Sequence, residues 1–376
     1  MKRSLLLLVL LIVLCSYSCN QDKREKTESK NYKAEKINDF KVIAYWTGSG
    51  KIEKEKINQL DQVIYSFLHL KGNRLFVEAR DSIKLRYLNA QKEINPGLKV
   101  LISLGGWGGC ETCSEVFETD SGRREFAQSV KDLMKVYDAD GIDLDWEYPA
   151  IAGFEGHAYK PQDRENFTLL IKELRFQLGE EAIISFAAGG FRNYLLNSIE
   201  WEKLMPLVNN VNVMTYDMVG GGSSRTGHHT ALFSTRDQPR SANATIKYLD
   251  SIGVSSEKIV LGAAFYARVW EKVKAENNGL YQSGVFKESV LYRDLDTYKN
   301  KLSNAKVFWD SEAQAPYIYS AENEVFVTYD DSLSVSLKTN YALENNLGGI
   351  MFWRLSGDKP AGLLDVIERE VMNFKD

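Results

Sequence analysis

Three carboxylic acids recur at every second position in the segment Asp140-Gly-Ile-Asp-Leu-Asp-Trp-Glu-Tyr-Pro149. They are Asp143, Asp145 and Glu147, and apolar residues stand between them. Side chains two residues apart on a β-strand point to the same face, so this spacing predicts three carboxyl groups that project together. Like charges this close repel each other and cost stability. The segment therefore indicates a site, and its chemistry would be the proton transfer or bond cleavage that grouped carboxyl groups perform.

Eight short apolar runs could form the scaffold that positions these acids. They cover residues 41–46, 63–70, 99–106, 141–147, 182–189, 209–217, 259–267 and 348–355. Runs this apolar are typical of parallel strands covered on both faces. Helical patterns separate most of them, for example at 122–137 and 164–178. Eight strand–helix repeats predict an α/β fold, the (β/α)8 TIM barrel, and the first strand lacks the Gly-rich loop of a nucleotide-binding open sheet.

One connection is much longer than a single crossover helix requires. About 80 residues separate the seventh and eighth apolar runs. Residues 330–345 have the pattern of the expected last helix, which leaves residues 268–328 with strand-like and aromatic pieces. We expect this stretch to form a small α+β insertion between strands 7 and 8.

Polar and aromatic residues gather where the predicted strands end. In this fold the chemistry lies at the carboxyl ends of the strands. The residues placed there are Tyr45, Trp46, Ser103, Gly105, Gly106, Trp107, Met214, Tyr216, Asp217, Tyr266, Arg268 and Trp353. Each alone has a structural explanation, such as core packing or a salt bridge on the rim. Their joint position at one end of different strands favours a common site.

These motifs resemble those of glycoside hydrolase family 18, the chitinase-like group. The matching elements, in the same order, are Ser103-x-Gly105-Gly106, Asp140-x-x-Asp143-x-Asp145-x-Glu147, Met214-x-Tyr216-Asp217, Tyr266-x-Arg268 and Trp353. The resemblance covers roughly residues 40–370, so residues 39–376 are assigned to the catalytic barrel. The insertion is similar to the chitinase insertion domain that walls one side of the cleft. Ala267 departs from the pattern, since many relatives carry Gly there.

The resemblance implies catalysis in which the substrate's own 2-acetamido oxygen attacks the anomeric carbon, with retention of configuration. Glu147 is then the general acid and later the base. Asp145 orients the acetamido N–H, and Asp143 shares a proton with Asp145. Tyr216 would hydrogen-bond the acetamido oxygen, and Trp353 would form the apolar floor under the sugar.

The remaining site residues are expected to bind substrate or to support the site. Tyr45, Trp107, Met214, Asp217 and Arg268 are the expected substrate-binding residues, while Trp46 is either a sugar platform or a buried core residue. Asp140, Ser103, Gly105 and Gly106 are expected to be structural.

Chitin or another N-acetylglucosamine-containing oligosaccharide is the expected substrate, cleaved at β-1,4 bonds. An endo-β-N-acetylglucosaminidase acting on N-glycan cores would use the same chemistry and stays open. A chitin-binding lectin without catalysis is a third interpretation. Such relatives typically lack the terminal acid, and Glu147 is present.

Composition narrows the range of partners. The chain has 376 residues, 44% of them hydrophobic, and a formal net charge of -4, which does not favour nucleic acid. His228 and His229 lack a carboxylate at ligand spacing, so we expect them to shape their loop, with no metal and no cofactor. Cys110 and Cys113 could form a local disulfide, remain thiols or contribute to a metal site, and we expect the disulfide. A monomer is expected.

The amino terminus has the pattern of an export signal. Lys2 and Arg3 precede the apolar run 5–14, and Cys19 follows Ser18, as in a bacterial lipoprotein signal. We expect residues 1–18 to be the signal peptide, Cys19 to be lipidated, and the polar stretch 19–38 to be a flexible tether. The protein would then be exported and lipid-anchored in a bacterial cell envelope. A simple secretory peptide cleaved nearby is the alternative.

Overall fold

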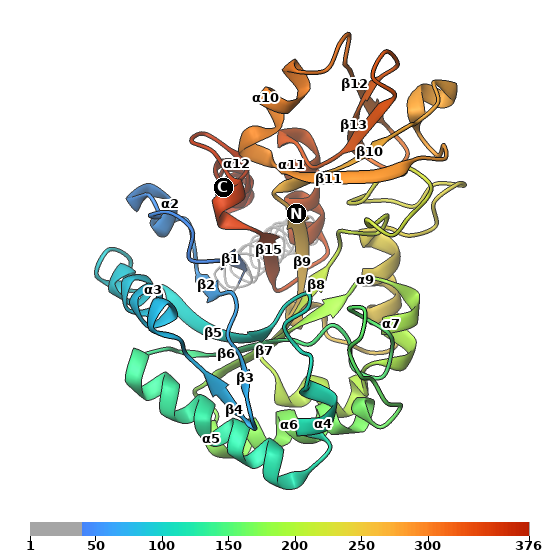
Figure 1. Cartoon of the computed structure of the whole chain (residues 1–376). Coiled ribbons are helices and arrows are strands. Elements are labelled where there is room, and N and C mark those ends of the chain that lie inside the picture. Colours follow the sequence, from blue (N-terminus) through green and yellow to red (C-terminus); the bar gives the residue numbers. More distant parts are fainter. Residues whose placement is uncertain (1–39, 376) are drawn as a thin grey trace, which may run out of the picture.

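The computed structural model of the protein describes residues 40–375, so the expected signal peptide, Cys19 and the tether lie outside the described residues. Within this range, eight parallel strands close into a barrel (Figure 1). In ring order they are β1 (Lys41–Trp46), β15 (Gly349–Trp353), β9 (Ile259–Ala264), β8 (Asn210–Met214), β7 (Ile183–Gly189), β6 (Gly141–Asp145), β5 (Lys99–Gly105) and β2 (Gln62–Tyr65). The predicted TIM barrel is confirmed.

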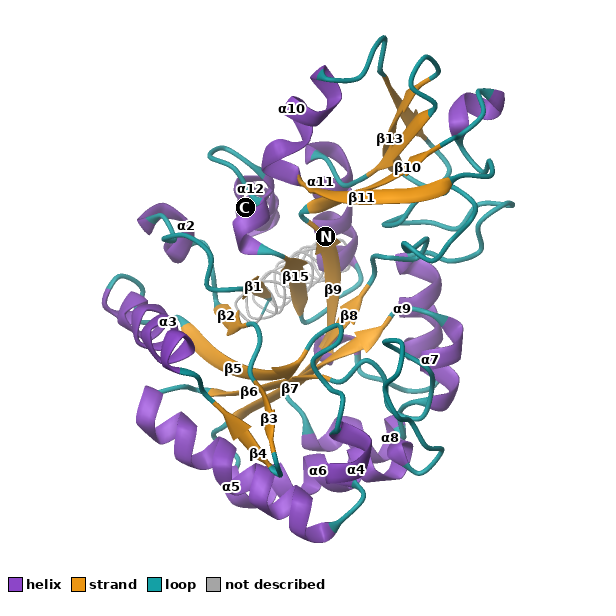
Figure 2. Cartoon of the chain, in the orientation of Figure 1, coloured by secondary structure: helices purple, strands orange, loops and turns teal. Residues whose placement is uncertain are grey.

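Helices lie outside the barrel and cover its strands (Figure 2). They are α2 (Lys54–Asn58), α3 (Ala79–Asn89), α4 (Cys113–Phe117), α5 (Asp120–Tyr137), α6 (Asp163–Leu178), α7 (Arg192–Asn197), α8 (Trp201–Leu204), α9 (Ala242–Ser251), α11 (Ser332–Glu344) and α12 (Leu363–Lys375). The start of α5 is capped by Thr119, whose side chain accepts a hydrogen bond from the Gly122 N–H. In residues 40–375, no helix combines the length and apolarity needed to cross a bilayer.

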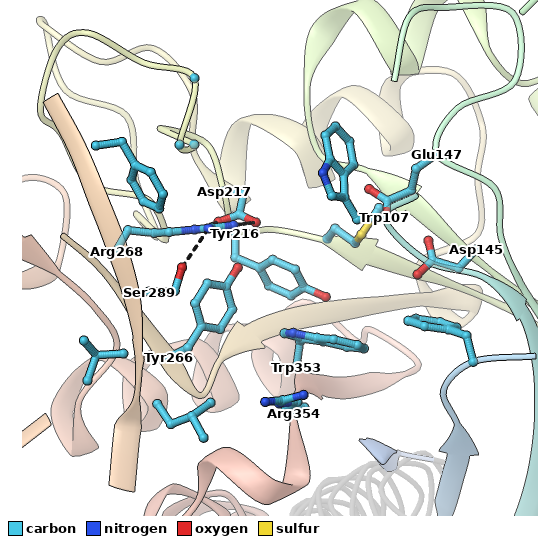
Figure 3. Close-up of a pocket in the computed structure, with 18 of the residues that line it drawn as sticks. Trp107, Asp145, Glu147, Tyr216, Asp217, Tyr266, Arg268, Ser289, Trp353 and Arg354 are labelled. Carbon is cyan, nitrogen blue, oxygen red and sulfur yellow. Dashed lines mark hydrogen bonds and ion pairs between the residues drawn. The ribbon is translucent and has the colours of Figure 1, made fainter. Parts of the chain in front are cut away.

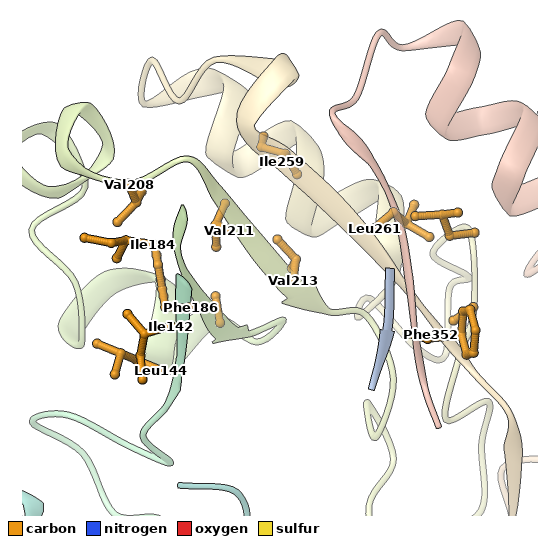
Figure 4. Close-up of a cluster of buried hydrophobic side chains, with 14 of the residues drawn as sticks. Ile142, Leu144, Ile184, Phe186, Val208, Val211, Val213, Ile259, Leu261 and Phe352 are labelled. Atoms are coloured by element: carbon orange, nitrogen blue, oxygen red, sulfur yellow. The ribbon is translucent and has the colours of Figure 1, made fainter. Parts of the chain in front are cut away.

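Strand alternation divides the core into two layers. Outward-facing residues such as Ile142 and Leu144 are buried between the strands and the helices (Figure 4). Inward-facing apolar residues form a smaller cluster in the barrel interior, made of Ile43, Tyr45, Ile64, Leu101, Val260 and Met351. Trp46 belongs to the outer layer, where it packs on Tyr65 and Tyr87. This burial decides between its two interpretations in favour of the core.

The second predicted strand is shorter than its sequence pattern indicates. It ends at Tyr65, whereas the apolar run continues to residue 70. After a bend, Leu68 bridges to Leu104, and the chain forms the hairpin β3 (His69–Lys71) and β4 (Arg74–Phe76). Gly72, with φ of 59°, supplies the left-handed turn between the two hairpin strands. The turn lies in Lys71-Gly72-Asn73-Arg74, directly after the run, and this signal could have predicted the hairpin.

A second sheet leaves the barrel between β9 and β15, and Figure 1 shows it in orange and red. Across residues 266–328, five antiparallel strands pair in the order β11 (Val285–Leu291), β10 (Tyr266–Glu271), β14 (Val325–Thr328), β13 (Ala315–Ser320) and β12 (Lys306–Asp310). The helix α10 (Leu295–Asn300) contributes Leu295 to a separate apolar core beneath this sheet. The insertion therefore carries hydrophobic cores of its own.

A buried ion pair joins the insertion to the barrel. Asp330 follows β14 and is fully buried, as is its partner Lys338 of α11, and their closest N–O distance is 2.6 Å. The same carboxylate accepts hydrogen bonds from Thr230 Oγ1 at 3.0 Å, Ser334 Oγ at 2.7 Å and the Ala264 N–H at 3.0 Å. Ala264 ends β9, just before the insertion begins, so one carboxylate holds both ends of the inserted segment.

Candidate active site

A cavity of about 820 Å³ opens where the barrel strands end (Figure 3). Its lining residues come from the carboxyl ends of barrel strands, from the loops after them and from the inserted sheet. They are Phe67, Trp107, Asp145, Glu147, Tyr148, Met214, Tyr216, Asp217, Gly220, Gly221, Gly222, Tyr266, Arg268, Phe286, Ser289, Val290, Leu291, Trp353 and Arg354. Most of the expected site residues thus surround one cavity at the carboxyl end of the barrel.

The acidic segment provides carboxyl groups at three depths. Asp143 and Asp145 lie on β6 and are buried, with Asp143 deeper in the barrel and excluded from the cavity lining. Glu147 lies two residues beyond the end of the strand and lines the cavity. The structure therefore brings Asp145 and Glu147 to the cavity and places Asp143 behind them.

Asp143 is enclosed by hydrogen-bond donors. Its carboxylate accepts hydrogen bonds from the Tyr45 hydroxyl at 3.0 Å, Ser185 Oγ at 2.5 Å and Asn212 Nδ2 at 3.1 Å. Burial raises the pKa of Asp143 to about 6, and these three hydrogen bonds oppose the rise. Ser103 pairs with Asp143 across β5 and β6, and its hydroxyl donates to the Tyr65 carbonyl at 2.5 Å.

Tyr45 does not have the surroundings expected of a substrate-binding residue. Its side chain is 2% exposed and lies outside the cavity lining, and its hydroxyl is engaged by Asp143 and Asn212. The strand-end position was identified correctly, but the side chain points inward beneath the floor of the cavity. Tyr45 therefore supports Asp143, and the expectation that it contacts the sugar is corrected.

Asp145 has a buried oxygen without a partner. In the part of the chain that the structure describes, no hydrogen-bond donor reaches its Oδ1. Burial raises the pKa of Asp145 well above its ordinary value, and the charges of Glu147 and Asp143 raise it further. Two glycines bring the neighbouring backbone close: the Gly106 N–H donates to the Asp145 carbonyl at 2.9 Å, and a side chain on Gly105 would collide with that carbonyl.

Glu147 has a carboxyl group adapted to proton transfer near neutral pH. Burial raises its pKa to about 7, with a hydrogen bond from Tyr148 opposing the rise and the charge of Asp217 adding to it. A group whose pKa lies near the working pH can both give and take a proton. The charge of Glu147 also raises the pKa of Asp145, so ionisation of one of these acids disfavours ionisation of the other.

Asp217 and Arg268 form a pair on the wall of the cavity. The guanidinium donates through Nε and Nη2 to the two carboxylate oxygens at 2.7 and 2.6 Å, and through Nη1 to Ser289 Oγ at 2.8 Å. Burial favours protonation of Asp217, but His229 and Arg268 outweigh it and hold its pKa below the usual range. Asp217 is therefore a fixed negative charge near Glu147, and Arg268 is neutralised by it.

Aromatic rings give the cavity an apolar floor and rim. Trp353 stacks on Phe67, with ring centroids 5.5 Å apart, and Tyr216 and Met214 also line the site. Trp107 stands at the rim and is 62% exposed, with edge contacts to Tyr148 and Phe154. Flat exposed rings next to hydrogen-bonding groups suit the apolar faces and polar edges of sugars.

The other predicted residues lie away from the cavity. Asp140 precedes β6 at the opposite end of the barrel, where it accepts a hydrogen bond from the Val100 N–H at 2.8 Å and contacts Lys92 at 2.8 Å. Cys110 and Cys113 form a disulfide. Among residues 40–375, no group of three or more His, Cys, Asp or Glu side chains could hold a metal ion.

The two loop histidines make separate contacts. His228 Nε2 lies 2.9 Å from Asp310 of the insertion, and His229 Nδ1 lies 3.6 Å from Asp217. Burial lowers the pKa of His229, which favours its neutral form. Each histidine therefore connects the loop after β8 to a neighbouring carboxylate.

Sequence reasoning missed several lining residues. Phe67 follows the bend after β2, Ser289 lies on the inserted sheet, and Arg354 comes directly after Trp353. Arg354 could have been found from its position next to an assigned residue at a strand end. Ser289 could not, because its place depends on how the inserted sheet packs on the barrel.

Comparisons with a family profile and with individual proteins indicate the same family. The profile of glycosyl hydrolases family 18 matches residues 41–358. Chitinase A1 of Niallia circulans is 34% identical over 313 residues, which are 76% of this chain and 44% of that protein. Chitinase B of Serratia marcescens is 29% identical over 399 residues, covering 85% of this chain and 77% of that protein.

Solved structures agree with this assignment. A family 18 N-acetylglucosaminidase from Paenibacillus barengoltzii superposes with a TM-score of 0.82 at 33% identity, covering 88% of this chain and 99% of that one. The chain spans about half the length of several curated relatives, including 44% of chitinase A1 and 50% of the Papio anubis oviduct-specific glycoprotein. With the profile match extending over most of the chain, this protein belongs to glycosyl hydrolase family 18.

Proposed function

We propose that this protein hydrolyses β-1,4-linked N-acetylglucosamine oligomers by a retaining mechanism in which the substrate's acetamido group is the nucleophile. The observation that carries the proposal is the pairing of Glu147, with its pKa raised to about 7, and Asp145, with its unpartnered buried oxygen, in one cavity. Family membership and the resemblance to named chitinases support the substrate class.

In this mechanism each residue has a separate task. Glu147 protonates the leaving oxygen and then removes a proton from the attacking water. Asp145 accepts the hydrogen bond of the acetamido N–H at its free oxygen, which orients the acetamido oxygen towards the anomeric carbon. Tyr216 would donate to that acetamido oxygen, and Trp353 would support the apolar face of the sugar.

The donor-enclosed Asp143 has a supporting task. Its three hydrogen bonds hold it in place behind Asp145, and its charge acts on the pKa of Asp145. During the reaction, a proton that moves onto Asp145 would remove its negative charge beside the developing positive centre. A proton that moves back to Asp143 would restore that charge. This would tune the strength of the Asp145 hydrogen bond.

The direct test compares two tetrasaccharides that differ at one position of each sugar. Chitotetraose should be cleaved, whereas cellotetraose, which lacks the 2-acetamido nucleophile, should not. Efficient cleavage of cellotetraose would contradict the substrate-assisted mechanism.

A second candidate is release of single N-acetylglucosamine units, because the Paenibacillus relative is described as an N-acetylglucosaminidase. Product profiles on chitohexaose distinguish the two: monosaccharide and pentamer in equal amounts at early times favour this candidate, and dimer, trimer and tetramer favour internal cleavage. A high-mannose glycopeptide tests the N-glycan alternative in the same assay.

We also propose that the enzyme is exported and anchored by lipid at Cys19, on the sequence pattern before that residue. Mass spectrometry of the amino-terminal peptide from the native host tests this. A diacylated Cys19 at the mature terminus is expected, and an unmodified terminus elsewhere would contradict the proposal.

A further inference from the structure

Two arginines line the cavity, and their surroundings differ. Arg268 is held in a two-point ion pair by Asp217 and also donates to Ser289. Arg354 makes one hydrogen bond, from Nη1 to Thr47 Oγ1 at 3.3 Å. In the described residues 40–375, no ion pair neutralises the Arg354 guanidinium. The cleft therefore contains one cation with a built-in counterion and one without.

The charge around Arg354 is reinforced by a second cation. Burial lowers the pKa of Arg354, and the charge of Arg293 lowers it further. Arg293 follows β11, and its Nε lies 3.5 Å from the carboxylate of its exposed neighbour Asp294. Arg354 is partly buried, and charges interact more strongly there than in bulk water. This part of the cavity is thus locally positive in a molecule whose formal net charge is -4.

Arg354 lies across the cavity from the catalytic acid. In the barrel ring, β15 and β6 are four strands apart in either direction, so Arg354 and Glu147 extend from opposite sides. In the view of Figure 3, Trp353 lies between Arg354 and Tyr216. A sugar resting on Trp353 would be cleaved on the Glu147 side, and the substituents of the sugar unit on the other side would approach Arg354.

We propose that Arg354 creates a subsite for an acidic sugar, a carboxylate-bearing unit of a 2-acetamido glycan next to the unit that is cleaved. This rests on the proposed hydrolysis of 2-acetamido glycans. A guanidinium and a carboxylate form two parallel hydrogen bonds and neutralise each other. A neutral hydroxyl can accept from the same donors but leaves the charge uncompensated. Conversely, a deacetylated unit carrying an ammonium group is repelled at this position.

The test uses four proteins and a matched set of tetrasaccharides. The proteins are the wild type, Arg354→Gln, Arg354→Lys and the control Arg74→Gln, an arginine in an exposed ion pair on β4. The substrates are chitotetraose, its analogues with a single C6-carboxylate at each position in turn, and its analogues with a single free amine at each position. The measured quantity is kcat/KM, and thermal unfolding of each variant verifies its fold.

We expect one acidic positional isomer to be cleaved about tenfold more efficiently than chitotetraose by the wild type. Arg354→Gln should bring the ratio of kcat/KM for that acidic isomer to kcat/KM for chitotetraose down to about one. Arg354→Lys should keep part of the preference, and Arg74→Gln all of it. The preference should also shrink as NaCl is raised, because salt screens the charge.

Two results would overturn the subsite. One is a wild type that shows no preference for any acidic isomer; the other is an Arg354→Gln variant that loses neutral and acidic substrates equally. Failure of the proposed function gives a different result, namely no cleavage of any tetrasaccharide in the set by the wild type.

Discussion

Asp330 and Asp145 are both buried carboxylates, and their surroundings are opposite. Asp330 faces Lys338 and accepts hydrogen bonds from Thr230, Ser334 and the Ala264 N–H. Asp145 faces two further acids, and its Oδ1 has no donor within the described part of the chain. The charge and the hydrogen-bonding needs of Asp330 are met by its neighbours. Those of Asp145 are not, so its burial costs stability.

The difference separates structural support from chemistry. An unpaired buried polar group costs about 1–3 kcal/mol, and that cost persists only where something else offsets it. At Asp330 the network holds both ends of the insertion on the barrel. At Asp145 the missing donor is the one that an acetamido N–H would supply. Asp330 therefore supports the fold, and the role proposed for Asp145 is to bind the acetamido group of the substrate.

The largest expected effect is on kcat, when Glu147 beside Asp145 is replaced. Glu147→Gln removes the transferable proton and should lower kcat by about 10²–10⁴-fold. Binding of chitotetraose, measured by calorimetry, should persist, because the floor and Asp145 are intact. The variant should be at least as stable as the wild type, since one of two repelling acids is gone. Undiminished turnover would sink the role assigned to Glu147.

Removing the carboxylate of Asp330 should lower the stability of the fold. Asp330→Ala leaves the buried Lys338 ammonium hydrogen-bonded to Thr230 but without its carboxylate partner, and should lower the free energy of unfolding by about 3–5 kcal/mol, measured in urea. The double variant Asp330→Leu with Lys338→Met should recover much of this loss. Asp132→Ala, which breaks an exposed ion pair with Arg74, is the control and should cost under about 1 kcal/mol. Equal losses of stability in Asp330→Ala and Asp132→Ala would contradict the structural role assigned to the buried Asp330.

The pH dependence should show the uncompensated acids directly. Burial raises the pKa of Glu147 to about 7, above the ordinary value of about 4.3 in an unfolded chain. The folded state therefore binds more protons between these values, so this group's contribution to stability falls as pH rises from about 4.3 to 7. Activity that needs protonated Glu147 should fall as pH rises through about 7.

Profiles of kcat/KM and of urea unfolding between pH 4 and 9 measure both trends. In Glu147→Gln the pH-dependent fall in stability should be smaller, because the variant lacks the titrating group. A rate that stays constant across pH 7 would contradict the acid role, and a wild-type stability that rises between pH 4.3 and 7 in step with that of the variant would contradict the raised pKa.

The smallest effect is expected at the rim of the cavity. Trp107 is 62% exposed there and makes ring contacts with Tyr148 and Phe154. Trp107→Ala should raise KM by about two- to tenfold, the range expected for one aromatic contact, and leave kcat nearly unchanged. Steady-state kinetics on chitotetraose give both values. A matching fall in kcat would mean that the ring positions the reacting sugar.

Much of the architecture was predictable because short apolar runs in the sequence indicate the barrel strands. The barrel and the acidic segment follow from local patterns. Tyr45 shows the limit, because alternation gives the face of a strand but not the depth of a side chain in the barrel. The donors around Asp143 come from β1, β7 and β8, and their meeting depends on the register of the closed ring. Sequence spacing carries no information on that register.

The most direct test of the contrast is Asp145→Asn, measured for both activity and stability. We predict that kcat on chitotetraose falls about 100-fold or more, while the free energy of unfolding is unchanged or increases, because a buried, repelled charge has been removed. A variant that loses several kcal/mol of stability but keeps its kcat would show that Asp145 is structural, like Asp330, and would overturn the catalytic role proposed for Asp145.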